Sequence, residues 1–121
     1  MKNDIQTTED IKQLVDAFYE KVNADQLLAP VFNAHANVNW DAHLPKMYAF
    51  WGTQLIGTGN YSGRPFPPHM DLPIGKEHFA MWLTLFIETV DENFSGAVAD
   101  IAKQKALNIA AVFQHKLEML R

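Results

Sequence analysis

Apolar residues recur at helical spacing through most of the chain. Near the N-terminus they follow the i, i+3, i+4, i+7 pattern of one face of an amphipathic helix, formed by Ile11, Leu14, Val15, Phe18, Tyr19 and Val22. Thr7 can cap this helix, and Glu9 and Asp10 place negative charge in its first turn, where the helix dipole favours it. The pattern predicts a first helix that ends near Asn23 to Asp25.

A second apolar stripe predicts a helix from about Asn39 to Ile56. Its members are Trp40, His43, Leu44, Met47, Phe50, Trp51 and Leu55. Pro45 interrupts this stretch, because proline lacks a backbone donor and crowds the carbonyl four residues before it. The helix therefore either becomes regular only near Pro45 or has distorted first turns.

Two further helices are predicted in the C-terminal half. One runs from about Gly75 to Asn93, and its inner face consists of Phe79, Trp82, Leu83, Phe86 and Val90. Gly96 separates it from a last helix, whose apolar residues are spaced by three or four: Val98, Ala102, Ala106, Ile109, Phe113, Leu117 and Leu120. No stretch alternates like a strand beside hairpin turn signals. The predicted fold class is all-α, with four substantial helices.

The connection between the second and third helices has an unusual composition. Gly57 ends the second helix and opens a glycine-rich loop. Four of the six prolines of the chain then fall within residues 65–73. This density excludes a long helix or a central strand. At most one helical turn fits, beginning at Pro67 or Pro68, where proline is tolerated as a first helical residue.

Composition narrows the class of protein. A chain of 121 residues with 48% hydrophobic and 20% charged residues fits one globular domain over residues 1–121 and excludes disorder throughout. A net charge of -4 argues against a nucleic-acid partner. The absence of cysteine excludes disulfides, thiolate catalysis and thiolate-held metals. The longest apolar stretch is far shorter than the ~20 residues of a membrane-spanning helix, and the N-terminus lacks the apolar core of a signal peptide. We therefore expect a cytoplasmic protein without a membrane partner.

Common catalytic and nucleotide-binding motifs are missing. The sequence contains no phosphate loop, no G-x-S-x-G elbow and no H-E-x-x-H zinc motif. It also lacks the Glu-x-x-His pairs of a di-iron bundle. The glycine-rich stretch from Gly57 to Gly63 follows a predicted helix rather than a strand, so it does not support a nucleotide site.

The five histidines are the remaining candidates for chemistry. His43 lies on the apolar stripe of the second predicted helix, where on its own it is most simply a core histidine. His69 lies among prolines, so its backbone has little freedom, and a metal ligand benefits because less ordering remains for the binding step. A single imidazole holds a bare divalent ion poorly. It can hold iron that already has four equatorial nitrogens, as in haem.

The aromatic residues suit a flat, apolar cofactor. The predicted buried stripes and connections contain Phe18, Phe32, Phe50, Trp51, Phe79, Trp82 and Phe86, although most of these, taken singly, are better explained as ordinary core. Tyr19 and Trp82 are more specific. Each places a hydrogen-bond donor on a buried stripe, where the donor needs an acceptor. A diatomic ligand held at the iron would be such an acceptor.

Five stretches of the chain, taken in their order, resemble the truncated haemoglobins and, within that family, group III. They are Phe18–Val22, Leu28–Asn33, His43–Trp51, His69–Pro73 and His78–Phe86. Each is weak alone, whereas together they are specific, and the similarity extends from about Ile11 to Leu117. The resemblance implies a two-over-two helical sandwich with a short proximal helix around a b-type haem, iron protoporphyrin IX. The family also offers a precedent for Pro45, two residues after its distal histidine.

The resemblance also implies roles for individual residues. His69 is the proximal iron ligand, and the distal, catalytic positions are those of Tyr19, His43 and Trp82. The cofactor-binding residues are expected to be Phe32, Lys46, Met47, Phe50, Arg64, His69, Phe79 and Trp82. Of these, Lys46 and Arg64 are assigned to the haem propionates only because they are basic, and most such residues are solvated surface charges. His35, His78 and His115 are expected to be structural or exposed, with His78 the one that could lie near the haem.

The implied function is the binding of dioxygen, carbon monoxide and nitric oxide at a five-coordinate iron. Two donors aimed at bound dioxygen slow its release, since each hydrogen bond to a charged group is worth on the order of 1.5–3 kcal/mol. We therefore expect oxygen, peroxide or nitric oxide redox chemistry, of nitric oxide dioxygenase or peroxidase type, rather than oxygen delivery. The sequence has no flavin or nicotinamide motif, so the electron donor would be a separate reductase.

Two alternatives stay open at this point. One is a globin that binds, transports or senses oxygen reversibly without turnover. The other is a helical interaction module without haem, in which all the aromatic residues are core. Apart from a reductase, we expect only diatomic gases as partners of a monomeric protein.

Overall fold

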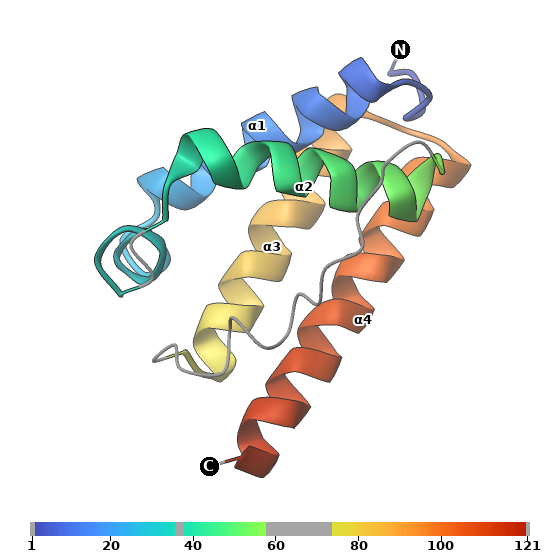
Figure 1. Cartoon of the computed structure of the whole chain (residues 1–121). Helices are drawn as coiled ribbons and strands as arrows, with labels where there is room; N and C mark the ends of the chain where they lie inside the picture. Colours follow the sequence, from blue (N-terminus) through green and yellow to red (C-terminus); the bar gives the residue numbers. More distant parts are fainter. Residues whose placement is uncertain (1, 36–37, 58–73, 121) are drawn as a thin grey trace.

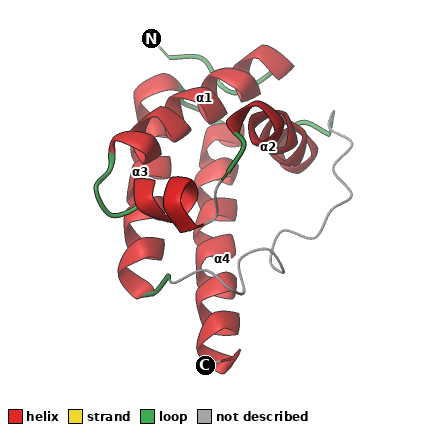
Figure 2. Cartoon of the chain, turned by 60° about the vertical axis from the view of Figure 1, so that its left-hand side comes forward, coloured by secondary structure: helices red, strands yellow, loops and turns green. Residues whose placement is uncertain are grey.

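The computed structural model describes residues 2–35, 38–57 and 74–120. Its elements are α1 (Thr8–Ala24), the π-helical turn η1 (Val31–His35), α2 (Trp40–Leu55), α3 (Lys76–Asn93) and α4 (Ala97–Leu120). These ranges contain helices and loops and no strand (Figure 2). None of the described helices is long and apolar enough to cross a membrane. The bounds of the four long helices lie close to those predicted, whereas η1 was not predicted.

The proline-rich connection lies outside the described residues. The helical turn predicted at Pro67 or Pro68 falls there, and so do the candidate site residues Arg64 and His69. These three assignments stay predictions.

The start of α1 confirms the predicted cap. Thr7 Oγ1 accepts a hydrogen bond from the Asp10 N–H at 3.1 Å, and Asp10 Oδ2 accepts one from the Thr7 N–H at 3.1 Å. This reciprocal capping box satisfies two backbone donors that a helix start would otherwise leave unpaired. The six apolar residues predicted for the inner face of α1 are all buried.

Pro45 lies inside a continuous α2. The helix begins at Trp40, and the side chain of its N-cap residue, Asn39, accepts the Asp41 N–H at 3.1 Å. The alternative in which the helix becomes regular only near Pro45 is therefore wrong. Proline removes one hydrogen bond, but packing outweighs that loss, because none of the seven residues of the predicted α2 stripe is exposed.

The four long helices form two pairs. α1 packs against α2 and α3, while α4 packs against α3 and touches α2. In Figure 1 the pair α1–α2 lies across the upper end of the pair α3–α4. Phe18, Phe86 and Val90 are fully buried where the pairs meet. This arrangement confirms the predicted two-over-two, all-α fold.

The first residues of the chain are tied to the start of α4. Asp4 Oδ1 accepts the Ala99 N–H at 2.8 Å, and Asp4 Oδ2 accepts the Val98 N–H at 3.0 Å. The neighbouring Ile5 is only 1% exposed. Gly96 has φ of +141°, and a Cβ at this position would lie 2.6 Å from the Asp4 carboxyl group. The glycine therefore makes room for a cap that comes from the other end of the sequence.

Candidate functional site

A largely apolar cavity lies between the two helix pairs. It has a volume of about 130 Å³. Its wall consists of Tyr19, Leu28, Val31, Phe32, His43, Met47, Phe50, Trp51, Ile74, His78, Phe79, Trp82, Ile109, Ala110 and Phe113. All four long helices and η1 contribute to this wall. The mostly apolar lining with a few polar groups is that of a site for a small molecule or cofactor.

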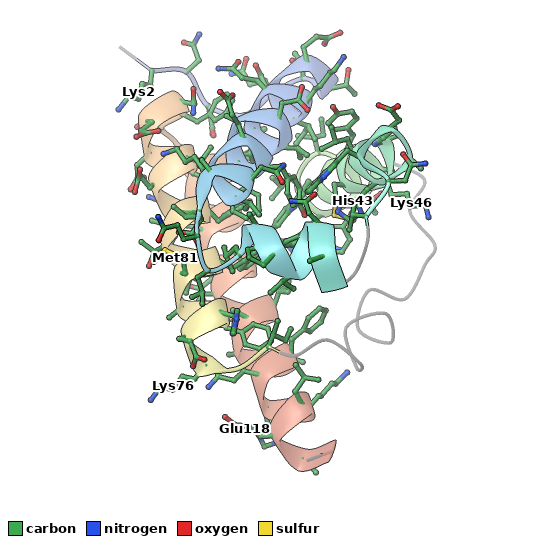
Figure 3. The ribbon with its side chains drawn as sticks, turned by 90° about the vertical axis from the view of Figure 1, so that its left-hand side faces the viewer. Lys2, His43, Lys46, Lys76, Met81 and Glu118 are labelled. Atoms are coloured by element: carbon green, nitrogen blue, oxygen red, sulfur yellow. The ribbon has the colours of Figure 1, made fainter. Side chains whose placement is uncertain are left out.

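The cavity brings together most of the predicted site residues. Those on its wall are Tyr19, Phe32, His43, Met47, Phe50, Phe79 and Trp82. Lys46 is not among them; it is exposed, and Figure 3 shows it at the outer side of α2. Arg64 and His69 lie outside the described residues. The roles of all these residues toward a cofactor stay predictions.

Tyr19 and Trp82 bring hydrogen-bond donors to the wall from α1 and α3. Tyr19 is only 7% exposed, and burial raises the pKa of its phenol well above the ordinary value of 10.0. The phenol therefore keeps its proton, because burial disfavours the charged phenolate. Among the described residues, neither the Tyr19 hydroxyl nor the Trp82 Nε1–H has a hydrogen-bond acceptor. Tyr19 is buried and Trp82 half-buried, and donors in such positions normally have partners, so this pair indicates a ligand with an acceptor atom.

His43 lies within a group of four rings that we term the four-ring cluster: Tyr19, Phe32, Trp40 and His43. All six pairs of rings are in contact, with centroid distances from 5.3 to 6.4 Å. Three of these rings line the cavity, whereas Trp40 lies behind them. Figure 3 shows His43 close to η1, on the inner side of α2. The cluster therefore joins α1, η1 and α2 at one corner of the cavity.

His78 is the second histidine on the wall and lies in the first turn of α3. Its Nδ1 accepts a hydrogen bond from the Gly75 N–H at 3.0 Å. A neutral ring held in this way carries its proton on Nε2. The neighbouring residues on this part of the wall, Ile74 and Phe79, are buried and apolar. Nowhere in the described ranges do three or more histidine or acidic side chains form a group that could hold a metal ion.

Sequence reasoning missed part of the wall. Ile109 and Phe113 belong to the predicted stripe of the last helix, but periodicity does not distinguish a residue that faces another helix from one that faces a cavity. Leu28 lies in a turn where Asp25 Oδ2 accepts its N–H at 2.9 Å, and no periodic signal marks such a turn. Trp51 was predicted to be buried, and its ring stacks on Phe86 at 4.7 Å. Its place on the cavity wall could not be read from the stripe.

Comparison with known proteins gives one consistent result. The family model of the bacterial-like globins matches residues 3–118. A group 3 truncated haemoglobin of Campylobacter jejuni is 36% identical in an alignment that covers 97% of this chain and 95% of that protein. The crystal structure of a group III truncated haemoglobin from Campylobacter jejuni matches with a TM-score of 0.86 at 36% identity, again over 97% of this chain and 95% of the other. The likeness therefore extends over sequence and fold together.

Proposed function

Because this chain belongs to the bacterial-like globins and, within them, to the group III truncated haemoglobins, we propose that its cavity holds a b-type haem and binds diatomic gases. The observation that carries this proposal is the pair of donors, Tyr19 and Trp82, that face an apolar cavity without an acceptor among the described residues. The iron ligand of the proposal is His69, as predicted from the sequence.

The residues of the wall fit an iron porphyrin. Of the described residues, seven Phe, Tyr and Trp side chains line the cavity, and Phe32, Phe50, Phe79 and Trp82 among them offer flat apolar surface to a flat apolar ring system. The cavity is also built from both helix pairs, so a bound cofactor would contact each of them. A chain without cysteine suits a haem held by one imidazole and apolar contacts.

Haem supplies an iron with an open coordination position, where dioxygen, carbon monoxide or nitric oxide can bind. Tyr19 and Trp82 would donate hydrogen bonds to the polar end of such a ligand from the mostly apolar wall of the cavity. Burial keeps the Tyr19 phenol protonated, so its O–H remains a donor. His43 adds a third polar group on the same part of the wall, as a donor or as a gate toward solvent.

The two donors also affect how fast a bound gas would be released, and therefore which function the protein could have. Each hydrogen bond to a partly charged ligand contributes on the order of 1.5–3 kcal/mol, and about 1.4 kcal/mol changes an equilibrium tenfold. Dioxygen held in this way leaves slowly, which is unsuitable for delivery. The proposed role is therefore redox chemistry of oxygen, peroxide or nitric oxide, with electrons from a separate reductase.

Absorption spectra of the oxidised, reduced and carbon monoxide forms of the purified protein test this proposal. We expect a Soret band that shifts when carbon monoxide is added to the reduced protein. His69→Ala should lose haem, whereas His115→Ala, at an exposed position of α4, should keep it. A wild-type protein without a Soret band after reconstitution with hemin would contradict the proposal. Turnover assays with nitric oxide and with peroxide then separate redox chemistry from simple binding.

A further inference from the structure

Trp40 lies at the start of α2, behind the cavity wall rather than on it. From its contacts we infer that Trp40 is a positioning residue, which holds His43 and Tyr19 in place on the wall through a hydrogen bond to η1. This inference rests on the proposed function, because its effect is on the gas ligand in the cavity.

The Trp40 indole is fixed by a short chain of hydrogen bonds. Trp40 Nε1 donates to Asn33 Oδ1 at 2.8 Å. Asn33 Nδ2 in turn donates to Asn23 Oδ1 at 2.9 Å and to the Ala29 carbonyl at 3.0 Å. The indole is thereby linked to η1 and, through Asn33, to the last turn of α1. Three elements around one corner of the cavity share this chain.

The fixed indole contacts every other ring of the four-ring cluster. It stacks on Phe32, with centroids 5.8 Å apart and an interplanar angle of 29°. It meets His43 edge to face at 5.5 Å and 84°, and Tyr19 at 5.3 Å. Trp40 and His43 are three residues apart in α2, so they lie on the same face of that helix. Neither His43 nor Tyr19 can swing toward Trp40 unless the indole moves as well.

This geometry gives the Trp40–Asn33 hydrogen bond a functional consequence. When it is intact, the indole supports the His43 imidazole and the Tyr19 phenol from behind, so the four rings keep one arrangement. When it is broken, the indole loses its fixed orientation, and the rings of the four-ring cluster part more often to admit a gas molecule. The direction of the Tyr19 O–H becomes less uniform for the same reason.

Two variants remove the same hydrogen bond from opposite sides. Trp40→Phe keeps an aromatic ring in the cluster but lacks the indole N–H, and Asn33→Ala lacks the acceptor. A neutral hydrogen bond of typical strength corresponds to about threefold to tenfold in an equilibrium. We therefore expect carbon monoxide to associate about threefold to tenfold faster with either reduced variant. Asn33→Ala also removes the two hydrogen bonds that Asn33 Nδ2 donates. The double variant should be no faster than the faster single variant, because both changes break the Trp40–Asn33 hydrogen bond.

The C–O stretching band of the carbon monoxide complex is the second measurement, since it reports the donor that faces the ligand. It should broaden or shift in both single variants. Tyr48→Phe is the matched control, because it also removes one hydrogen bond from α2, the one to Asp16 of α1, without touching the four-ring cluster. The control should leave both the association rate and the C–O band as in the wild type.

The outcomes are distinguishable. If Trp40→Phe and Asn33→Ala keep their Soret bands but behave like Tyr48→Phe in both measurements, the inference is wrong and the proposed function stands. If Trp40→Phe fails to fold, Asn33→Ala alone decides, because it keeps every ring of the cluster. If the wild type binds no haem, the proposed function fails and the inference fails with it.

Discussion

At the scale of single residues, the donors on the cavity wall make the strongest argument for a ligand. The Tyr19 phenol is buried and the Trp82 ring is half-buried, and neither donor has an acceptor among the described residues, so a ligand with an acceptor atom would satisfy both. Both were predictable, since each places a polar atom on a buried helical stripe. The role inferred for Trp40 was not predictable, because its stripe does not reveal the hydrogen bond to Asn33 of η1.

Removal of either donor should speed the release of dioxygen. In Tyr19→Phe the hydroxyl is lost while the ring stays, and we expect the dissociation rate constant to rise about tenfold, which corresponds to one hydrogen bond of ~1.4 kcal/mol. Trp82→Phe should have an effect of similar size. Stopped-flow measurement gives both rates. Tyr48→Phe is the matched control with an unchanged rate, and unchanged rates in all three variants would remove the role proposed for the donors.

The protonation of Tyr19 gives a prediction on pH. Burial raises the pKa of this phenol above its ordinary value of 10.0, so the O–H donor persists at alkaline pH. Dioxygen dissociation should therefore stay constant from neutral pH up to pH 10. Tyr48 does not disturb this measurement, because burial and the Asp16 carboxylate raise its pKa to about 12. A dioxygen dissociation rate that rises with pH, with a midpoint at or below the ordinary tyrosine pKa of 10.0, would show that the Tyr19 phenol is not held neutral by burial.

At the scale of elements, periodicity located the four long helices because each buries one continuous stripe. The turn η1 escaped prediction, since five residues are too few for a periodic pattern. The cap of α4 escaped for a different reason. Sequence rules search for a cap next to the helix start, whereas here Asp4 supplies it from the other end of the chain.

The long-range cap predicts coupled effects on stability. Asp4→Ala should lower the free energy of unfolding by about 1 kcal/mol, as expected for the loss of a helix N-cap. Gly96→Ala should also destabilise, because its Cβ would lie 2.6 Å from the Asp4 carboxyl group and φ is +141°. Gly96→Ala should lower the free energy of unfolding by less when Asp4 is replaced by glycine, because the new Cβ then meets no Asp4 side chain. Urea unfolding of the wild type, Asp4→Gly, Gly96→Ala and the double variant measures this coupling, and strictly additive effects would contradict it.

The same cap makes stability depend on pH. Burial raises the pKa of Asp4, but the backbone hydrogen bonds from Val98, Ala99, Ile5 and Ala97 lower it more, so the net shift is downward from 3.8. A lowered folded-state pKa stabilises the protein above the unfolded-state value, and this contribution disappears as the pH falls through the folded-state pKa. The stability difference between wild type and Asp4→Ala should therefore shrink below that pH. A difference that stayed constant in acid would show that the Asp4 charge is not involved.

At the scale of the whole molecule, the cavity is a product of how two helix pairs cross. Its wall combines Tyr19 of α1 with Ile109 of α4, ninety residues apart in sequence. No local pattern in the sequence could place them on the same wall, so the cavity could not be predicted from the spacing of apolar residues. The overall arrangement was predictable only through the family resemblance, which the fold confirms.

A ligand that contacts both helix pairs should stabilise the whole fold. Binding to the folded state alone raises the apparent stability by about 2.7 kcal/mol at a hundredfold excess over Kd. For a chain of this size, that corresponds to a Tm increase on the order of 10 °C. Circular dichroism of the apo and hemin-loaded protein measures this shift. An equal Tm with and without hemin would mean that haem does not bridge the two pairs.

The central claim is that one haem occupies the cavity between the helix pairs. Titration of the apo protein with hemin tests it most directly, when the Soret band and tryptophan fluorescence are followed together. We predict that the Soret band saturates at one equivalent and that fluorescence is quenched in parallel, because Trp51 and Trp82 lie on the cavity wall. A Soret signal that never saturates, or tryptophan emission that stays unquenched while the band develops, would contradict the claim.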